Sequence, residues 1–362
     1  MDSPCSQIQN SLKNLLDLRT QFAETYSRVD ENKDRHDPEN KQAIEYSLAL
    51  MEETKLAQEL LNLQLQYASQ KKILYQTSLL ESFPDDEEYD AIEGIDREVY
   101  PIPTLEQFTE RIKAKREMVK NKYEQGFTKL ILVPFGMPLS ILIMRYAQLL
   151  NQHNKENTLF STDGTKLDLE VDNPVFFWDG YLGLKPNKKP NKEIIYEADR
   201  AGDLIYFPNN FDKDDHQGKT KLELLKEENG SQAWQILLLE DLPDLPAENK
   251  GKTIKDRKQL EANKTPNDYL KAIQTQKQYQ SEQGLTLESW LIYAITQLQE
   301  KNQAIDDYQG QGKACYLTGS YQKKFGSVPY AYWSRVDRQA ELSGSYPGFP
   351  RGRDACRSGV MI

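Results

Sequence analysis

The sequence predicts an α+β protein with helices in its first part and short strands gathered towards its end. Leucines in the first 80 residues step at intervals that average about 3.5 residues, the spacing of a helix that packs along one face. Further on, apolar runs with the length of buried strands, such as Leu130–Val133 and Trp234–Leu239, are separated by amphipathic segments. Strands interrupted by helices indicate α+β rather than a purely helical or purely stranded fold.

Length and charge restrict the possible functions. The chain has 362 residues and a net charge of −10, so it is long enough for two domains and too acidic to favour nucleic acid as its main partner. Three cysteines make no disulfide framework and favour a reducing compartment. The first residues lack the basic start and apolar core of a signal peptide, and no apolar run reaches the length of a membrane span. We therefore expect a cytoplasmic protein without membrane contact.

Residues 1–80 are predicted to be helical. Leu56, Leu60, Leu63, Tyr67 and Leu74 share a helical face, and a charged turn at residues 30–40 separates them from an earlier helix. The pattern favours a helical hairpin over an intermolecular coiled coil, although the latter would give a homo-oligomer or bind a helical partner. Residues 81–103 are predicted to be an acidic linker, and residues 104–362 a single ligand-binding domain with inserted helices.

Within the third region, the pattern predicts an order of helices and strands. Val175–Trp178 and Leu204–Phe207 are expected to pair as strands across a polar loop that contains Lys185–Lys189. Short strands are expected at Leu130–Val133, at Trp234–Leu239 and around Cys315–Ser320. The predicted helices are Leu105–Gln125, Leu139–Asn151, Lys255–Glu261, Pro266–Tyr279 and Leu287–Asn302.

Residues 326–362 differ in composition from the rest of the chain. Tyrosine, serine, glycine and arginine crowd together here without a helical or strand period, and only the last residues, from Cys356 to Ile362, alternate like a buried strand. Tyrosine and tryptophan give large, rigid contacts, serine and glycine adapt, and arginine anchors, as in antibody-like contact surfaces. The stretch carries no obvious set of catalytic acids and bases. We interpret it as a contact surface for a ligand.

The order of residues in this stretch resembles a known family. The motif V-P-x-A-Y-W-x-x-x-x-R-Q-A-x-L from Val328 to Leu342, followed by a Gly/Ser/Arg-rich run and the ending C-R-S-G-V at Cys356–Val360, is similar to the variable proteins of diversity-generating retroelements, especially those of candidate-phyla bacteria. The resemblance extends back to Phe127 and implies a C-type-lectin-like domain, related to formylglycine-generating enzymes, with a hypervariable region at about residues 328–356. It implies a non-enzymatic protein that binds a protein or other macromolecular ligand.

In that family, surface positions are rewritten by adenine-directed mutagenesis, usually from Asn codons, which never yield Glu, Gln, Lys, Met or Trp. The resemblance implies variable, ligand-binding positions of the types that such codons reach: Tyr330, Tyr332, Ser334, Arg335, Val336, Asp337, Ser343, Ser345, Phe349, Pro350, Arg351, Gly352, Arg353 and Asp354. Fixed residues would hold the backbone between them: Trp333, Arg338, Gln339, Ala340, Leu342, Cys356 and Arg357.

Two cysteines raise an alternative function. Enzymes related to this family use paired cysteines in the C-terminal half to bind copper and activate oxygen, so Cys315 and Cys356 could serve an oxidase-like or cofactor-binding enzyme. Both lie in apolar, strand-like settings, where a free cysteine is most often a small buried apolar residue. The structural role is therefore favoured, and no catalytic residue and no cofactor are predicted.

The remaining motifs are weaker. Gly218-Lys219-Thr220 and Gly251-Lys252-Thr253 each precede a predicted helix like the end of a phosphate-binding loop, but the earlier glycine of that motif is missing from both. Asp212, Asp214, Asp215 and His216 form an acidic loop without the spacing of a known calcium loop. Plain turns and a solvated loop are favoured over a nucleotide site and a metal site, so no metal is predicted.

Overall fold

The computed structural model describes residues 4–29, 38–83, 89–178, 199–227, 232–310, 312–350, 352 and 354–362. The chain divides into two compact units, Met1–Ser69 with Pro103–Lys120 and Gln70–Ile102 with Asn121–Ile362. Helices and strands both contribute substantially, so the predicted α+β class is confirmed. Among the described residues, no helix combines the length and the apolar character that crossing a membrane requires.

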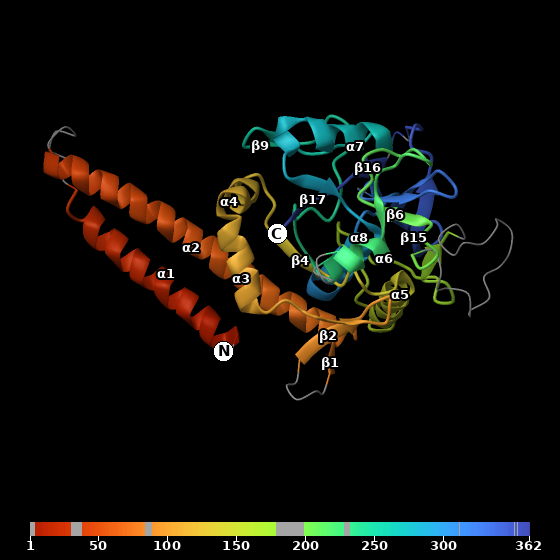
Figure 1. Ribbon diagram of the computed structural model, residues 1–362, viewed down its shortest axis with the longest axis horizontal. Helices are drawn as coiled ribbons and strands as arrows, with labels where there is room; N and C mark the ends of the chain where they lie inside the picture. Colours follow the sequence, from red (N-terminus) through yellow and green to blue (C-terminus); the bar gives the residue numbers. More distant parts are fainter. Residues whose placement is uncertain are drawn as a thin grey trace. The chain divides into compact units, whose positions relative to one another are not determined.

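The first unit is helical, as predicted. Helices α1 (Pro4–Tyr26) and α2 (Pro38–Gln76) lie side by side in Figure 1, and the Arg19 guanidinium donates a hydrogen bond of 2.9 Å to Gln58 across them. Buried and half-buried positions of α1 recur at alternating steps of three and four residues, for example at Leu15, Leu18 and Phe22, which is the spacing of a coiled-coil seam. The favoured helical hairpin is therefore present within one chain.

Helices α3 (Leu105–Ala114) and α4 (Arg116–Glu124) replace the single helix predicted from Leu105 to Gln125, because the chain leaves helical geometry at Lys115. The predicted cap is confirmed: Thr104 accepts from the amide of Gln107, and the Gln107 side chain accepts from the amide of Thr104. Tyr67 of α2 stacks on Phe108 of α3 with ring centroids 5.1 Å apart.

Where the structure describes it, at residues 81–83 and 89–103, the segment predicted as an acidic linker is folded, so the linker prediction is wrong for these residues. It contains the antiparallel strands β1 (Glu81–Phe83), β2 (Tyr89–Glu93) and β3 (Val99–Pro101), and it belongs to the second unit. Ala91 and Ile92 are buried, and Ile95 packs against Leu225 and Ala233. A few apolar side chains between many carboxylates are enough to fix this small sheet.

A four-stranded antiparallel sheet forms one core of the second unit. Its order is β11 (Glu282–Gly284), β17 (Ser358–Met361), β8 (Gln235–Leu239) and β4 (Lys129–Val133), which confirms the strands predicted at Leu130–Val133 and Trp234–Leu239 to within one residue. Helices α5 (Leu139–Lys155) and α8 (Leu287–Lys301) are likewise confirmed, and they pack together. Trp290 of α8 is fully buried, as expected of a core residue.

A five-stranded mixed sheet carries the residues of the C-terminal stretch. Its order is β16 (Asp354–Cys356), β12 (Ala314–Tyr316), β14 (Val328–Ser334), β15 (Gln339–Ser345) and β5 (Val175–Phe177). Strands β14 and β15 thus lie in residues whose sequence shows no strand period. The predicted pairing of Val175–Trp178 with Leu204–Phe207 is wrong, because β5 pairs in parallel with β15.

The remaining short strands complete the second unit. Strand β6 (Leu204–Tyr206) lies between β13 (Ser320–Gln322) and β7 (Lys219–Thr220), which leads into the short helix α6 (Lys221–Lys226). The helix predicted at Lys255–Glu261 is replaced by a hairpin of β9 (Thr253–Ile254) and β10 (Arg257–Lys258). Lys255 and Asp256 both have positive φ, at 45° and 64°, which a two-residue hairpin turn uses and a helix does not allow. The Lys185–Lys189 loop lies outside the described residues.

Helix α7 (Pro266–Thr275) and the short 3₁₀ helix η3 (Lys277–Tyr279) correspond to the single helix predicted from Pro266 to Tyr279. A capping box between Thr265 and Asp268 begins α7, and Pro266 follows the cap. Tyr269, Ala272 and Ile273 of α7 pack against Tyr316, Tyr330 and Cys356 of the five-stranded sheet. Helix α7 therefore covers part of one face of that sheet and limits which of its residues are accessible.

Candidate functional site

The hairpin of β14 and β15 organises the predicted variable positions. The two strands pair along their whole length, with Tyr330 opposite Ser343, Tyr332 opposite Glu341 and Ser334 opposite Gln339. Side chains of directly paired residues lie on the same face of a sheet, and successive residues point to opposite faces. The register therefore gives the hairpin one face of Val328, Tyr330, Tyr332, Ser334, Gln339, Glu341, Ser343 and Ser345, which we call the tyrosine face.

The opposite face, which we call the core face, carries the smaller and more apolar residues. It consists of Pro329, Ala331, Trp333, Ala340, Leu342 and Gly344. Trp333 is 1% exposed, and Ala331, Ala340 and Leu342 are completely buried. All predicted variable positions within the two strands thus lie on the tyrosine face. The predicted scaffold residues Trp333, Ala340 and Leu342 lie on the core face, whereas the predicted scaffold residue Gln339 does not.

Helix α7 covers one part of the tyrosine face and leaves another part open. Tyr330 is buried in the cluster under α7, whereas Tyr332 and Tyr308 are half-buried at its margin. The rings of Tyr330 and Tyr332 stack at 5.8 Å with an interplanar angle of 5°, and Tyr308 contacts Tyr332 at 5.2 Å. Beyond Tyr332, Ser343 is half-buried and Phe176 of β5 is exposed. The accessible part of this face therefore runs from Tyr332 towards the β5 edge of the sheet.

Tyr332 is fixed in place by Glu341. Its hydroxyl donates to Glu341 Oε2 across the strand pair. Burial raises the pKa of Glu341, and burial together with this carboxylate raises the pKa of Tyr332 well above its usual range.

The turn between the strands is the most exposed part of the hairpin. Val336 is 75% exposed, Asp337 and Arg338 are exposed, and the buried Ser334 hydroxyl donates a hydrogen bond of 2.7 Å to the Asp337 carboxylate. This bond and others hold the pKa of Asp337 below its usual range. Arg338 has a positive φ of 56° and pairs with Glu170 at 2.7 Å. The turn is thus a fixed loop that presents Val336 and Asp337.

Arg335 differs from its neighbours because its guanidinium is bound by two carboxylates. Its Nε lies 2.8 and 2.9 Å from the carboxylate oxygens of the buried Asp307, and its Nη2 lies 3.2 Å from Asp163. The hydrogen bond from Ser161 and those from Thr165 hold the pKa of Asp163 well below its usual range. Hydrogen bonds to Asp307 raise the pKa of Arg335. This predicted ligand-binding residue therefore also ties the turn to the loops around residues 163 and 307.

The loop after β15 brings two further aromatic residues to the surface. Tyr346 is 72% and Phe349 66% exposed, and the carbonyl of Pro347 accepts from the amide of Asn267 in α7. Pro350 and Gly352 are exposed. Arg351 and Arg353 lie outside the described residues.

Four predicted variable positions are poorly accessible. Tyr330, Ser334, Ser345 and Asp354 are all buried. The positions that a ligand can reach among the described residues are those with exposed or half-buried side chains: Tyr332, Arg335, Val336, Asp337, Ser343, Phe349, Pro350 and Gly352.

The predicted scaffold residues Gln339 and Arg357 make defined polar contacts. Gln339 accepts from the Asn173 side chain at 2.9 Å beside β5. Arg357 is buried and pairs with Asp306 at 2.6 Å, and Asp306 also accepts from the Trp290 indole at 2.9 Å. The backbone of Asp306 in turn accepts from the amide of Trp333. Arg357 thus connects β17 and α8 to the strand that carries Tyr332.

Cys315 and Cys356 are completely buried free thiols in the neighbouring strands β12 and β16. Burial raises the pKa of both, that of Cys356 to about 12. A thiolate is the form that binds metals and attacks substrates. Their setting therefore favours the structural role over the oxidase-like alternative.

The other motifs of the sequence are accounted for by local structure. Thr220 caps α6 with Glu223, whereas Gly251-Lys252-Thr253 leads into β9 and not into the predicted helix. In the acidic loop, one Asp212 oxygen accepts from the amides of Asp214 and Asp215. Across the described part of the chain, no group of three or more His, Cys, Asp or Glu side chains is placed to hold a metal ion.

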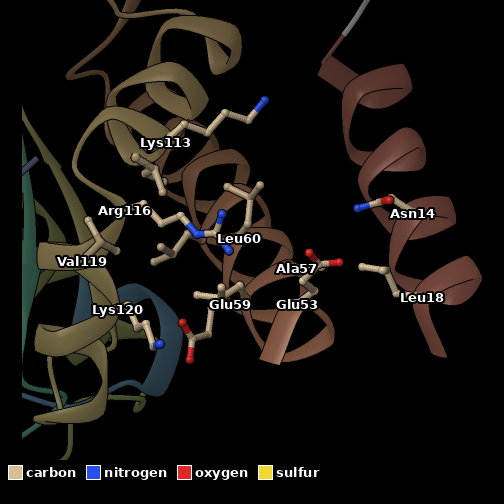
Figure 2. Close-up of a pocket in the computed structure, with 13 residues that line it drawn as sticks. Asn14, Leu18, Glu53, Ala57, Glu59, Leu60, Lys113, Arg116, Val119 and Lys120 are labelled. Carbon is tan, nitrogen blue, oxygen red and sulfur yellow. The ribbon is translucent and has the colours of Figure 1, made fainter. Parts of the chain in front are cut away.

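The helical unit contains a separate cavity of about 290 Å³ between α1, α2 and the α3–α4 pair. Figure 2 shows Lys113, Arg116 and Lys120 on one side and Asn14 and Leu18 of α1 on the other. The cavity wall is leucine-rich with a charged rim, and it includes none of the residues predicted as a site. Lys120 on this rim pairs with Glu52 of α2.

Comparison of the chain with protein-family models, with curated proteins and with solved structures finds no match. The assignment of a function therefore depends on the geometry above.

Sequence reasoning missed three residues that shape the surface. Tyr308 and Phe176 border Tyr332 and Glu341, and Asp307 binds Arg335. These contacts join segments that are far apart in the sequence, so local patterning gave no signal for them.

Proposed function

We propose that the chain is a non-enzymatic binding protein that presents the accessible part of the tyrosine face, the 334–338 turn and the following loop to a protein or other macromolecular ligand. One observation carries this proposal. The strand register assigns every candidate variable position within β14 and β15 to the tyrosine face and keeps Trp333, Ala340 and Leu342 on the buried core face. Tyr332 and Ser343, the accessible positions among them, can change without disturbing the buried residues of the core face.

The chemistry of the accessible positions supports contact with a macromolecule. Tyr332, Phe176, Tyr346 and Phe349 offer aromatic surface, and Arg335 and Asp337 add charged groups of both signs. Aromatic and arginine side chains dominate the energetics of protein interfaces, and mixed polar neighbours supply specificity. The described residues of this region carry no paired acid and base that would favour catalysis.

As part of the same proposal, the domain is C-type-lectin-like and the protein is cytoplasmic, a diversified receptor of the retroelement type. A lectin-like fold does not by itself imply sugar or calcium binding. No cofactor is required for recognition of this kind.

The genomic neighbourhood provides the test. The proposal predicts a reverse transcriptase gene and a second, near-identical copy of the segment that encodes Val328–Ile362, with adenines where the two copies differ. An isolated gene without a template copy, together with a tail that is invariant among cells of the source population, would rule out diversification.

A further inference from the structure

The α1–α2 hairpin has a second apolar face that α3 and α4 leave uncovered. Leu12, Leu16 and Tyr26 on α1 and Met51 and Leu65 on α2 are each 45 to 52% exposed. Large apolar side chains scattered singly on a surface need no explanation, but a contiguous set marks an interaction surface.

Helical geometry places these residues on one side of the hairpin. A helix turns by about 100° per residue, so Leu12 and Leu16 lie roughly a quarter turn away from the seam formed by Leu15, Leu18 and Phe22. Asn14 and Leu18 border the cavity of Figure 2 and so mark the other side of α1. On α2, Met51 and Leu65 likewise lie roughly a quarter turn away from the seam formed by Leu50, Ala57 and Leu61.

The contact between Arg19 and Gln58 confirms that the two helices share this side, because both residues fall on it and their side chains are 2.9 Å apart. Charged residues of α1 gather on a different side, at Lys13, Asp17 and Glu24. We call the surface around Arg19 and Gln58, with the five apolar side chains, the free face of the hairpin.

The free face is nearly symmetric about the Arg19–Gln58 contact. Leu12 and Tyr26 lie one heptad before and after Arg19, and Met51 and Leu65 lie one heptad before and after Gln58. A two-fold axis through this contact would place the Leu12–Leu65 end of one copy against the Tyr26–Met51 end of another. Both ends are apolar, so the face is complementary to itself, as a two-fold interface must be.

We propose that the free face joins two copies of this chain, so that their hairpins form an antiparallel four-helix bundle. The available area is adequate. Helix α1 has 23 residues and is therefore about 35 Å long, and two adjacent helices are about 20 Å wide. Two such faces would remove on the order of 1,400 Å² from water, within the range of about 1,200–2,000 Å² for stable interfaces.

Arg19 would lie near the two-fold axis, where its polar side chain fixes the register of the bundle. A single polar residue in an apolar helix interface specifies register at some expense of stability. The dimer would carry two copies of the tyrosine face, which raises the avidity for a multivalent ligand. The inference does not depend on the proposed function.

Sedimentation velocity of the full chain over a wide range of concentrations tests the proposal. We expect a species of twice 41.9 kDa. Leu16→Glu combined with Met51→Glu should raise the dimer dissociation constant about tenfold or more, because it places charges in the apolar contact. Gln21→Glu adds one such charge to an exposed position of α1 outside the free face and should leave the dimer intact. Circular dichroism of each variant verifies that the helices remain folded.

Cross-linking tests the symmetry separately. In a chain with Cys5→Ser, Arg19→Cys should form a disulfide between two copies on mild oxidation, and Gln21→Cys should not. A chain that stays at 41.9 kDa at every concentration, or a dimer that the Leu16 and Met51 substitutions leave unchanged, overturns the proposal. Equal cross-linking by both cysteine variants overturns the assignment of the axis.

Discussion

Replacement of Arg335 by alanine tests whether the hairpin turn is held by its ion pair with Asp307. The Asp307 side chain is completely buried and that of Arg335 is 29% exposed. Removing one partner of a fully buried pair costs about 3–5 kcal/mol, because the remaining charge loses its compensation. Since Arg335 is partly solvated, and since the amide of Gly310 still donates to Asp307, we expect the free energy of unfolding of Arg335→Ala to fall by about 2–3 kcal/mol.

Chemical denaturation, monitored by tryptophan fluorescence, measures this loss in the free energy of unfolding. Three further variants test whether the loss comes from the buried charge of Asp307. Val336→Ala, at the exposed neighbouring position, should change the free energy of unfolding by about 0.5 kcal/mol or less. Asp163→Asn removes only the outer, partly exposed partner and should cost at most about 1 kcal/mol. In the double variant Arg335→Ala with Asp307→Asn, about half of the Arg335→Ala loss should return, because the buried charge is gone.

If Arg335→Ala is as mild as Val336→Ala, Arg335 does not hold the turn and the reasoning from the buried carboxylate is refuted. The result bears on the proposal that the 334–338 turn is part of a diversified binding surface. A large loss would mean that diversification at position 335 changes stability as well as recognition, whereas positions 336 and 337 vary freely.

Three further predictions concern the core face, the covering helix and the buried thiols. Trp333→Ala should lower the free energy of unfolding by about 3–5 kcal/mol because it empties a buried site. Tyr332→Ser, at the accessible edge, should lower it by about 1 kcal/mol. If denaturant unfolding gives equal losses of free energy for the two variants, the division into two faces is contradicted. Hydrogen bonds from Thr265 hold the pKa of Asp268 below its usual range, so its contribution to α7 is complete above the unfolded pKa of about 4 and is lost as the pH falls through the folded pKa. The free energy of opening of α7 amides, obtained from hydrogen exchange after correction for the intrinsic rate at each pH, should therefore fall at acid pH less in Asp268→Asn than in the parent; an identical fall would be inconsistent with the cap. In a chain with Cys5→Ser, Cys315 and Cys356, as buried thiols of raised pKa, should react with a thiol reagent only as fast as the protein unfolds, and fast labelling of this native variant would show that one of the two is accessible.

Helices and strands whose residue pattern lies entirely within their own segment were predicted correctly from the sequence. The helix α8 has a buried apolar face and the β4 and β8 strands are continuous apolar runs, so each is visible in its own residues. The caps at Thr104 and Thr265 likewise follow from residues three apart. These signals need no knowledge of the rest of the chain.

The β14–β15 hairpin escaped prediction because both of its faces carry large or aromatic side chains. Tyr330 and Tyr332 alternate with Ala331 and Trp333, so no contrast between polar and apolar positions marks the strand period. The parallel partner β5 lies more than 150 residues earlier in the chain, and local patterning does not encode such a pairing. The family resemblance identified the variable positions, but only the register separates Tyr332 from the buried Tyr330.

Charged residues led to wrong predictions in two situations: where their side chains are buried, and where they surround a small apolar core. Lys221, Glu288, Arg257 and Glu282 are ordinary surface types, but their side chains are fully buried in ion pairs, with Lys221 2.8 Å from Glu288 and Arg257 2.7 Å from Glu282. The nine carboxylates of residues 81–98 similarly obscured the strands β1 to β3. Composition measures average charge, whereas burial depends on which partners the fold brings together.

A comparison of two libraries tests the central claim that the hairpin has one replaceable and one structural face. One library diversifies accessible positions, Tyr332, Val336, Asp337 and Ser343, and the other diversifies an equal number of core positions, Ala331, Trp333, Ala340 and Leu342, with the same mutagenised Asn codons. Clones are selected for resistance to proteolysis, which reports folding, and then sequenced. The account predicts that folded clones are at least about tenfold more frequent in the first library, as expected when buried substitutions cost several kcal/mol and exposed ones little. Equal survival of the two libraries would contradict it.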